Sequence, residues 1–537
     1  MRISFMILFI ATSLLGAAPM RFCLPGDELP GVLPRPAGIA DKTPASNAIG
    51  DIEFNAETGD VWISTGNGLS VSRDGGTNWE NKLDGYGFSA LSVLGDWVIA
   101  AASFDTVVND PTDPLPVGDG FFISFDRGET FERLDSLTDE DLRHVCRIGQ
   151  IAYDVALVPE GPDTGIYAAC FYGGILYSSD RGANWENVIP NGDDTLRYSS
   201  TDLDHRFFSI AADTSAEPPL IWAGSAKGLF AGHAGDFAWV WHDVDGRWIP
   251  DSVPVYDTTW VDSVTFEVDS VSDFYIEWNA DPACTSAISG EWIISIDFRY
   301  GGDTTGVFAS TRSTGSDGGY DAISYSFSDG VNWSLTGDGY VAWNMGFACD
   351  KLWAACTHGL SRFDRPDYTE GDTIEIAGHD LLTGLQTQIL VDEVVSVTDC
   401  NGRIFVGTYS EGLAMTDNCG ETWSIIGRFA VPGEGSNDPG ESVYAYPNPF
   451  SPNRHGGCFF VFEYENPEEN VKIEVFDYDI RKVVTVFDGS NFDKDGGWMR
   501  VQWDGTLTDG RYPANGLYFF RIKNGDRERW GKLMIIK

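Results

Sequence analysis

The chain has 537 residues, more than one ordinary hydrophobic core accommodates, so we expect two domains or a repeated architecture. It contains 61 Gly, 18 Trp, 20 Tyr and 33 Phe among Val- and Ile-rich runs, which is typical of short strands and tight turns and argues against a helical protein. The formal net charge of −46 disfavours binding to a phosphate backbone, so nucleic acid is not an expected partner.

The N-terminal segment has the pattern of a secretion signal. Met1 and Arg2 precede an apolar run over residues 3–15 and the small residues 16–18, which are the three parts of a signal peptide. The run is too short to span a membrane, and no later stretch of the sequence is long and apolar enough to do so. We therefore expect a signal peptide at 1–18, an N-terminal extension at 19–46, and a secreted or cell-surface protein without a transmembrane segment.

The nine cysteines have no CxxC spacing, which argues against a zinc site, and their odd number leaves at least one thiol unpaired. Two disulfides are candidates. One joins Cys349 to Cys356 across a hairpin, and the other joins Cys400 to Cys419 across neighbouring strands. The alternative is that these cysteines are small buried apolar residues.

A repeat with the pattern S-x-D-x-G-x-[TN]-[WF] runs through residues 47–430. Full copies occupy 72–79, 124–131 and 178–185, and each follows a glycine and a short apolar strand. Partial and degenerate copies bring the number to seven units of strand, turn, strand, loop, strand, box and strand. Seven four-stranded units predict an all-β, seven-bladed β-propeller, an architecture that hides sheet edges by radial repetition.

The box resembles the Asp-box, or BNR repeat, of sialidases, sortilin-type receptors, xyloglucanase-type glycosidases and a photosystem assembly factor. In those families the box is a folding element. The resemblance implies that its Asp bonds turn amides and that its aromatic residue wedges between sheets, and Asp in Gly-containing turns commonly accepts backbone donors. The residues with this structural role are Asp74, Trp79, Asp126, Phe131, Asp180, Trp185, Trp333 and Trp423.

Residues 431–440 have the composition of a linker, and a second domain is expected at 441–537. Alternating strands with Gly and Asn turns predict a small antiparallel β-sandwich. Its motifs are Tyr446-Pro447-Asn448-Pro449-Phe450, Trp503-Asp504-Gly505, Gly516-Leu517-Tyr518 and a terminal strand that begins near Lys532. Their order resembles the C-terminal sorting domain of type IX secretion substrates and the immunoglobulin-like domain of flagellar hook-capping proteins. This resemblance implies recognition by a secretion machinery, then release or surface attachment; the alternative is an exported sandwich without a sorting role.

The longest connections all fall on the propeller face opposite the boxes, where binding residues usually reside. The largest is the insertion at 243–290, whose alternating runs predict a β-hairpin lid, with a decorative insertion as the alternative. Candidate binding residues on this loop-rich face are Arg147, His205, Arg206, His358, Glu393 and Tyr409.

None of these candidates has a spacing that a known reaction requires, and the R-I-P segment expected before the first blade of a sialidase is absent from the sequence. We assign no catalytic or metal-ligating residue and expect no cofactor; calcium in the acidic loops is the alternative. The predicted function is an exported, non-catalytic protein that recognises an extracellular glycan or protein through the loop-rich face. The alternatives are a glycoside hydrolase that uses carboxylates on that face and a passive surface scaffold.

Overall fold

The computed structural model describes residues 43–106, 115–134, 150–161, 163–188, 203–233, 238–260, 266–300, 305–313, 318–365, 368, 371–381, 386–389, 394–409, 411–426, 443–446, 448, 450–452, 457–464, 470–478, 480–489, 497–507, 510–525 and 527–536. Apart from one short 3-10 turn, the elements of these residues are all β-strands. No helix in this part of the chain is long and apolar enough to cross a membrane.

The first blade has the pattern that the others repeat. Strands β1 (Ile49–Phe54), β2 (Val61–Thr65), β3 (Gly68–Ser72) and β4 (Glu80–Lys82) are hydrogen-bonded in that order. Strands β2 and β3 are buried at every position, which explains why they read as continuous apolar and small runs. Strand β4 carries exposed and half-buried polar residues because it forms the outer edge.

Six further sheets follow in chain order. Blade 2 contains β5 (Gly87–Leu94), β6 (Trp97–Thr106), β7 (Leu115–Ser124) and β8 (Glu132–Arg133), and blade 3 contains β9 (Ala152–Glu160), β10 (Asp163–Cys170), β11 (Gly174–Ser178) and β12 (Glu186–Val188). Blade 4 contains β13 (Phe207–Asp213), β14 (Leu220–Ser225), β15 (Gly228–Gly232), β16 (Val240–Asp243), β17 (Gly246–Trp260) and β18 (Phe266–Ala280). The 3-10 turn η2 (Leu203–His205) precedes β13.

Blade 5 contains β19 (Trp292–Arg299), β20 (Gly306–Arg312), β21 (Ala322–Ser326) and β22 (Ser334–Thr336), and blade 6 contains β23 (Ala342–Ala348), β24 (Lys351–Cys356), β25 (Gly359–Asp364) and β26 (Gly371–Ile374). Blade 7 contains β29 (Val394–Cys400), β30 (Arg403–Thr408), β31 (Leu413–Thr416) and β32 (Trp423–Ile426). Strands β27 (Ala377–Asp380) and β28 (Gln386–Gln388) extend its outer edge, because β27 pairs in parallel with β32.

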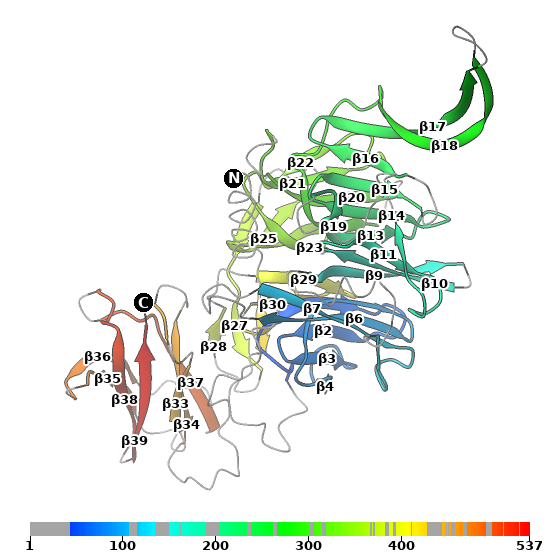
Figure 1. Ribbon diagram of the computed structural model, residues 1–537. Coiled ribbons are helices and arrows are strands. Elements are labelled where there is room, and N and C mark those ends of the chain that lie inside the picture. The colour runs from blue at the N-terminus through cyan, green and yellow to red at the C-terminus, as the bar shows by residue number, and fades with distance from the viewer. Residues whose placement is uncertain are drawn as a thin grey trace.

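The seven sheets form a closed ring. Each innermost strand contacts the innermost strand of the next blade, and β29 returns to contact β1, as the stacked sheets of Figure 1 show. Every blade takes its four inner strands from one continuous stretch of chain. The first and last blades are joined by the Gly412 amide, which donates to the Asn47 carbonyl at 3.0 Å, and by Arg403, which donates to the Gly75 carbonyl.

Both predicted disulfides are wrong, because the structure pairs Cys349 with Cys419 at a Cα–Cα distance of 6.0 Å. Cys349 lies in the turn before β24 and Cys356 ends that strand, so the two residues stand at opposite ends of it. Cys356 and Cys400 are buried free thiols, which agrees with the alternative of small buried apolar residues. The disulfide joins a turn of blade 6 to the box turn of blade 7.

The insertion at 243–290 forms a β-hairpin, but the prediction that it is a lid is wrong. Strands β17 and β18 follow β16 in the sheet order, so they lengthen the outer edge of blade 4 and lead away from the axis. Figure 1 shows this hairpin projecting beyond the side of the propeller. Its direction is set by the pairing of Trp241 with Trp248, which continues the sheet outward.

The C-terminal residues form two sheets. One contains β33 (Val443–Tyr446), β34 (Cys458–Tyr464) and β37 (Gly497–Trp503). The other contains β36 (Lys482–Gly489), β35 (Val471–Phe476), β38 (Gly516–Asn524) and β39 (Arg527–Ile535), hydrogen-bonded in that order. Phe450 and Trp503, which belong to two of the sequence motifs, pack at 5.9 Å in the buried core of this domain.

Asn448 of the first motif protects the edge of β39. Its side-chain Nδ2 donates to the Lys532 carbonyl at 3.0 Å and its Oδ1 accepts the Met534 amide at 2.8 Å, so the amide takes the place of a neighbouring strand. Phe450 continues this pairing through backbone hydrogen bonds with Met534 and Ile536. The motif therefore covers an edge that would otherwise be open to other chains.

Candidate functional site

Every innermost strand of the propeller contains one β-bulge at the same register, opposite the end of the second strand. The bulged residues are Gly50, Ser89, Tyr153, Phe208, Ile294, Trp343 and Val395. A bulge redirects a side chain that regular pleating would send elsewhere. All seven residues line one cavity on the propeller axis.

The bulged residues close the axis instead of leaving a channel. Five of them carry large apolar side chains, and the cavity has a volume of only about 50 Å³, beside Gly50 and Ser89, which have the smallest side chains. Such a cavity holds a few water molecules, whereas pockets for organic ligands measure about 300–1,000 Å³. A ligand on the axis would therefore rest on this surface and would not enter the propeller.

Buried aromatic rings cover the axis at the loop-rich end, where the innermost strands begin. We call Tyr153, Phe171, Phe208, Trp292 and Trp343 the axial floor, and all five belong to one core cluster. Phe171 packs against Tyr153 at 5.3 Å and against Phe208 at 5.9 Å, and Phe208 packs against Trp292 at 5.7 Å. Blades 3 to 6 thus contribute to one continuous, buried aromatic cluster.

Arg206 is the candidate residue that lies at the axial floor. Its guanidinium carbon lies 5.2 Å from the ring centres of both Phe171 and Tyr172, and the residue is 1% exposed. A cation held over aromatic faces is stabilised by their quadrupoles. His205, which precedes it in η2, is also buried.

The candidates His358 and Tyr409 lie in other blades than Arg206. His358 is exposed in the turn between β24 and β25, where its Nδ1 lies 3.0 Å from the Thr357 hydroxyl. Tyr409 is half-buried between β30 and β31. Arg147 and Glu393 lie outside the described residues.

Two buried donors near the axial floor have no hydrogen-bond partner in the described part of the chain. They are the indole Nε1 of Trp292, which is 4% exposed, and the amide Nε2 of Gln150, which is fully buried. The other end of the Gln150 amide is occupied, because its Oε1 accepts the Tyr172 backbone N–H. Donors left without a partner cost stability, so a ligand that carries acceptor oxygens is the group they could bind.

Sequence reasoning missed most of the axial floor, although a signal for it exists. Each inner strand from blade 3 to blade 7 begins with two adjacent apolar residues, at 152–153, 207–208, 293–294, 342–343 and 394–395. Such a pair breaks the alternation of a strand with one buried face, and a bulge at its second residue is the reason.

Two carboxylates, of Asp51 and Asp154, line the same small cavity as the bulged residues. Asp51 accepts the Leu91 amide at 3.2 Å and Asp154 accepts the Ile210 amide at 2.9 Å, so each joins its blade to a neighbouring sheet. Burial raises the pKa of Asp297 to about 7. Burial also raises the pKa of Glu53 well above its usual range, and the charges of Asp51, Asp154 and Asp297 add to this effect.

In the part of the chain that the structure describes, no group of three or more His, Cys, Asp and Glu side chains is arranged to hold a metal ion. Asp51 and Asp154 accept backbone amides of neighbouring sheets, which gives each a structural role between blades.

The turns of the full box copies have the same pattern of hydrogen bonds. In the full copies the carboxylate accepts the backbone N–H four residues on, at 2.8 Å for Asp74 and Asp180 and 2.9 Å for Asp126. The indole N–H groups of Trp79 and Trp185 donate to the carbonyl of the box glycine at 3.1 and 3.0 Å. Hydrogen bonds from the side chain and amide of the Thr four residues on lower the pKa of Asp126 to about 2.

The aromatic residue of a box packs on the second strand of the preceding blade. Phe131 contacts Trp62 with ring centres 6.4 Å apart, Trp333 contacts Trp222 at 6.2 Å and Trp423 contacts Trp353 at 6.4 Å, all edge to face. This packing accounts for the bulky residue that recurs in each second strand.

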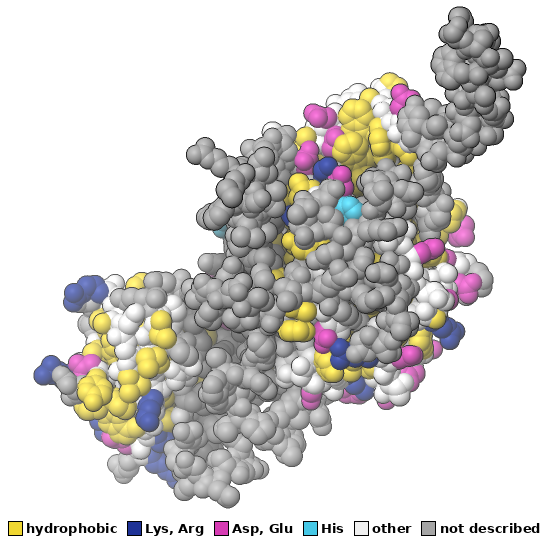
Figure 2. Space-filling view, in the orientation of Figure 1, with side chains coloured by type: hydrophobic (Ala, Val, Ile, Leu, Met, Phe, Trp, Pro, Cys, Tyr) yellow, Lys and Arg dark blue, Asp and Glu magenta, His cyan; other side chains and the backbone are white. Residues whose placement is uncertain are grey.

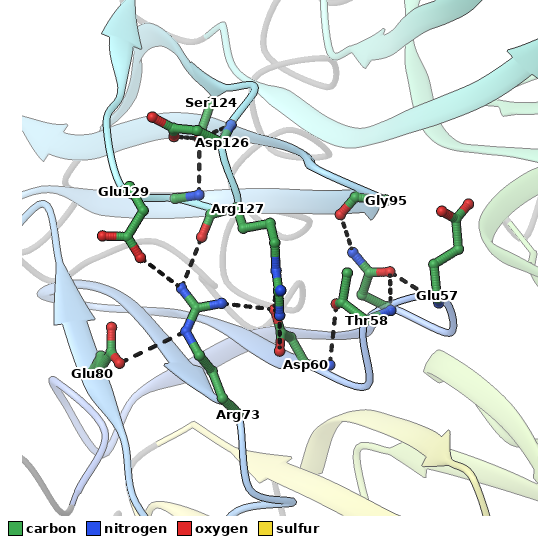
Figure 3. A network of polar contacts seen from close by, with 12 residues as sticks. Glu57, Thr58, Asp60, Arg73, Glu80, Gly95, Ser124, Asp126, Arg127 and Glu129 are labelled. Carbon is green, nitrogen blue, oxygen red and sulfur yellow. Dashed lines mark hydrogen bonds and ion pairs between the residues drawn. The ribbon is translucent and has the colours of Figure 1, made fainter.

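Asp60 joins the first two blades on the box face (Figure 3). Its buried carboxylate accepts hydrogen bonds from Arg127 of the second box, at 2.8 and 2.9 Å, and from Arg73 of the first box at 2.9 Å. Arg73 also donates to the Arg127 carbonyl at 3.0 Å and pairs with Glu129 at 3.3 Å. The polar groups of this face are therefore used between blades, whereas those near the axial floor include donors without a partner.

Proteins similar to this chain were found among solved structures. No family model matches the chain, and no curated protein matches it. The chain is similar to PorZ of Porphyromonas gingivalis, described as an essential bacterial surface component of the type-IX secretion system, at 16% identity and a TM-score of 0.30 over 91% of this chain and 66% of PorZ. It therefore spans less than two thirds of the length of PorZ.

Two other solved structures are similar. YCF48 from Cyanidioschyzon merolae is 16% identical with a TM-score of 0.39, over 70% of this chain and 97% of YCF48. The GH74 enzyme of Niastella koreensis is 12% identical with a TM-score of 0.44, over 93% of this chain and 75% of the enzyme. The β-propeller fold of this chain is shown by the sheet order and by the contacts between innermost strands.

Proposed function

We propose that this chain is an exported, non-catalytic binding protein whose loop-rich propeller face recognises an extracellular glycan or protein. The observation that carries the proposal is the axial floor, a buried aromatic cluster with the donors of Trp292 and Gln150 beside it. Aromatic rings with a few placed polar groups are the usual composition of a ligand site. Arg206, stacked on the same surface, adds a positive charge that would favour an acceptor-rich ligand.

The alternative function is a glycoside hydrolase that uses carboxylates on the same face. An inverting pair needs two carboxylates about 6.5–9.5 Å apart with access to the substrate. The two carboxylates that line the axial cavity, of Asp51 and Asp154, accept backbone amides of neighbouring sheets, which favours a structural role over hydrolysis. In the same proposal the box residues, including Asp74, Asp126 and Asp180, have a structural role between blades and take no part in recognition.

The test of the binding function measures the full chain against a panel of soluble polysaccharides, with and without uronic acids, by calorimetry. Trp292→Phe keeps an aromatic ring and removes the Nε1–H, and Gln150→Glu keeps Oε1 and replaces the donor with an acceptor. We expect each variant to weaken binding by about tenfold, the cost of roughly one hydrogen bond. Trp79→Phe on the box face is the matched control and is expected to bind normally.

Two results would overturn this proposal. One is unchanged affinity of both loop-face variants for every polysaccharide and for surface proteins of the same organism that the wild type binds. The other is release of reducing sugars by the wild-type chain, which would favour the hydrolase.

We also propose that residues 441–537 direct secretion through a type IX-like machinery or attach the chain to the surface. The order of the sequence motifs supports this, together with two packed sheets in which Phe450 and Trp503 form part of the core. In a host with a type IX system, deletion of 441–537 is expected to leave a folded propeller in the periplasm. Secretion of the truncated chain at the normal level would contradict this role.

A further inference from the structure

The hairpin of β17 and β18 is held firmly at its base. Trp241 stacks on Trp248 with ring centres 6.0 Å apart and meets Trp278 edge to face at 5.8 Å. Arg247 forms an ion pair with Asp281, whose amide donates to the Arg247 carbonyl at 2.9 Å. The base is thus a continuous part of blade 4, and Figure 1 shows the hairpin continuing outward from it.

Strand β18 is the outermost strand of this six-stranded sheet. Among the described strands it pairs with β17 and with no other, although it is 15 residues long. Its register with β17 is regular over eight consecutive pairs, from Trp248 opposite Ala280 to Val255 opposite Asp273, and shifts beyond them. Residues 273–280 therefore form an unpaired, regular strand edge.

Proteins usually block such an edge with Pro, Lys, a very short strand or a covering element. Strand β18 contains no Pro and no Lys, and its four charged residues, at 267, 269, 273 and 277, are all acidic. Over the whole hairpin, residues 246–280, seven acidic residues stand against one basic residue, a net charge of −6. Like charges placed opposite each other on paired strands are destabilising, so the edge is protected against a second copy of itself and remains open to a cationic strand.

We propose that residues 273–280 of β18 form a docking edge for an extended, cationic polypeptide segment of a partner protein, which adds as a seventh strand to blade 4. Backbone hydrogen bonds along the edge provide the affinity of such strand addition, and alternating side chains provide the specificity. Here the specificity is electrostatic, because the acidic residues of the hairpin attract Lys and Arg on the incoming strand. This site lies at the outer edge of blade 4, apart from the axial floor, so it goes beyond the proposed ligand recognition.

The test uses the full chain and three labelled eight-residue peptides. The first alternates Lys with Val or Thr, the second has the same charge but carries Pro at two central positions, and the third carries Glu in place of Lys. Fluorescence anisotropy at near-physiological salt is expected to show binding of the first peptide. The second is expected to bind about tenfold more weakly because Pro removes ladder donors, and the third should show no binding.

Two variants of the chain complete the test. In one, residues 249–279 are replaced by a two-residue Asn-Gly turn, which keeps the pairing of Trp241 with Trp248. In the other, Asp273→Asn and Glu277→Gln neutralise the regular part of the edge without changing its backbone. We expect the first variant to lose binding of the Lys peptide and the second to weaken it several-fold, with circular dichroism and melting temperature of the second variant unchanged.

Equal binding of the Lys peptide and its Pro-containing counterpart would overturn the proposal, because it would show attraction by charge alone. Retained binding by the shortened hairpin would overturn it as well. Concentration-dependent dimerisation that disappears when the hairpin is shortened would contradict a cationic partner. It would show that a second copy of this chain occupies the edge. None of these results depends on whether the axial floor binds a ligand.

Discussion

Asp297 provides the sharpest quantitative prediction. Burial raises the pKa of its carboxyl group to about 7 from the reference value of 3.8, and its Oδ1 accepts the Phe298 amide at 2.7 Å. Asp297→Asn keeps this acceptor and removes the charge. A difference of about three pKa units corresponds to about 4 kcal/mol at 1.36 kcal/mol per unit, which is an upper limit because Asp297 is only half-buried.

The direction in which stability changes with pH follows from the raised pKa of Asp297. The folded state binds a proton that the unfolded state has already lost, so the contribution of Asp297 to stability is full below about pH 4 and is lost as pH rises through about 7. The free energy of unfolding of the wild type should therefore fall relative to that of the variant by about 1.4 kcal/mol per pH unit between pH 5 and pH 6.

Urea denaturation of both proteins from pH 4 to pH 8, followed by tryptophan fluorescence, measures this difference. The exposed residue Asp338 supplies the control, and Asp338→Asn should leave the pH profile unchanged. Parallel profiles of wild type and Asp297→Asn across the whole range would refute the reasoning, because they would show that Asp297 titrates alike in both states.

Three further predictions concern the packing of the blades and of the C-terminal domain. Gly128→Ala would place a methyl carbon 2.2 Å from a buried indole and should destabilise the propeller by more than 2 kcal/mol. This is about twice the effect expected of Gly85→Ala, which shares a positive φ but meets no atom within 4 Å. Thermal denaturation compares the two variants, and equal losses of stability would exclude the clash. Replacing Cys349 and Cys419 by Ser opens a loop of 70 residues and should lower the free energy of unfolding by up to about 4 kcal/mol. The urea midpoint of this variant should be lower than that of the oxidised wild type. An unchanged midpoint would show that ring closure alone constrains the two blades. Asn448→Ala removes two hydrogen bonds to β39 and should destabilise the C-terminal domain by about 1–2 kcal/mol. It should also raise the tendency of the purified chain to aggregate, which light scattering measures. A variant that stays monodisperse and keeps the wild-type stability would contradict the role of Asn448 in edge protection.

The repeat could be predicted from the sequence because its causes are local. A box binds its own amides within eight residues, as the contact between Asp74 and the Asn78 amide shows, and such turns must recur at the same point of each blade. The fold class and the face that carries the long connections follow from this spacing. The alternating runs of the insertion likewise predict a hairpin, because strand pairing across a short turn is also local.

The rest depends on which segments meet in space. The axial floor needs blades 3 to 6 to converge, so a Phe of blade 4 and a Trp of blade 6 join one cluster although 135 positions separate Phe208 from Trp343. Cys349 finds Cys419 because adjacent blades bring two turns together, a contact that no spacing within one blade reveals. The hairpin leads outward and not over the axis because Trp248 pairs with Trp241 at the outer edge of the sheet. Local chemistry thus determined the repeating unit of this protein, and only the closure of the ring decided which side chains reach the axis and which strand edge is left unpaired.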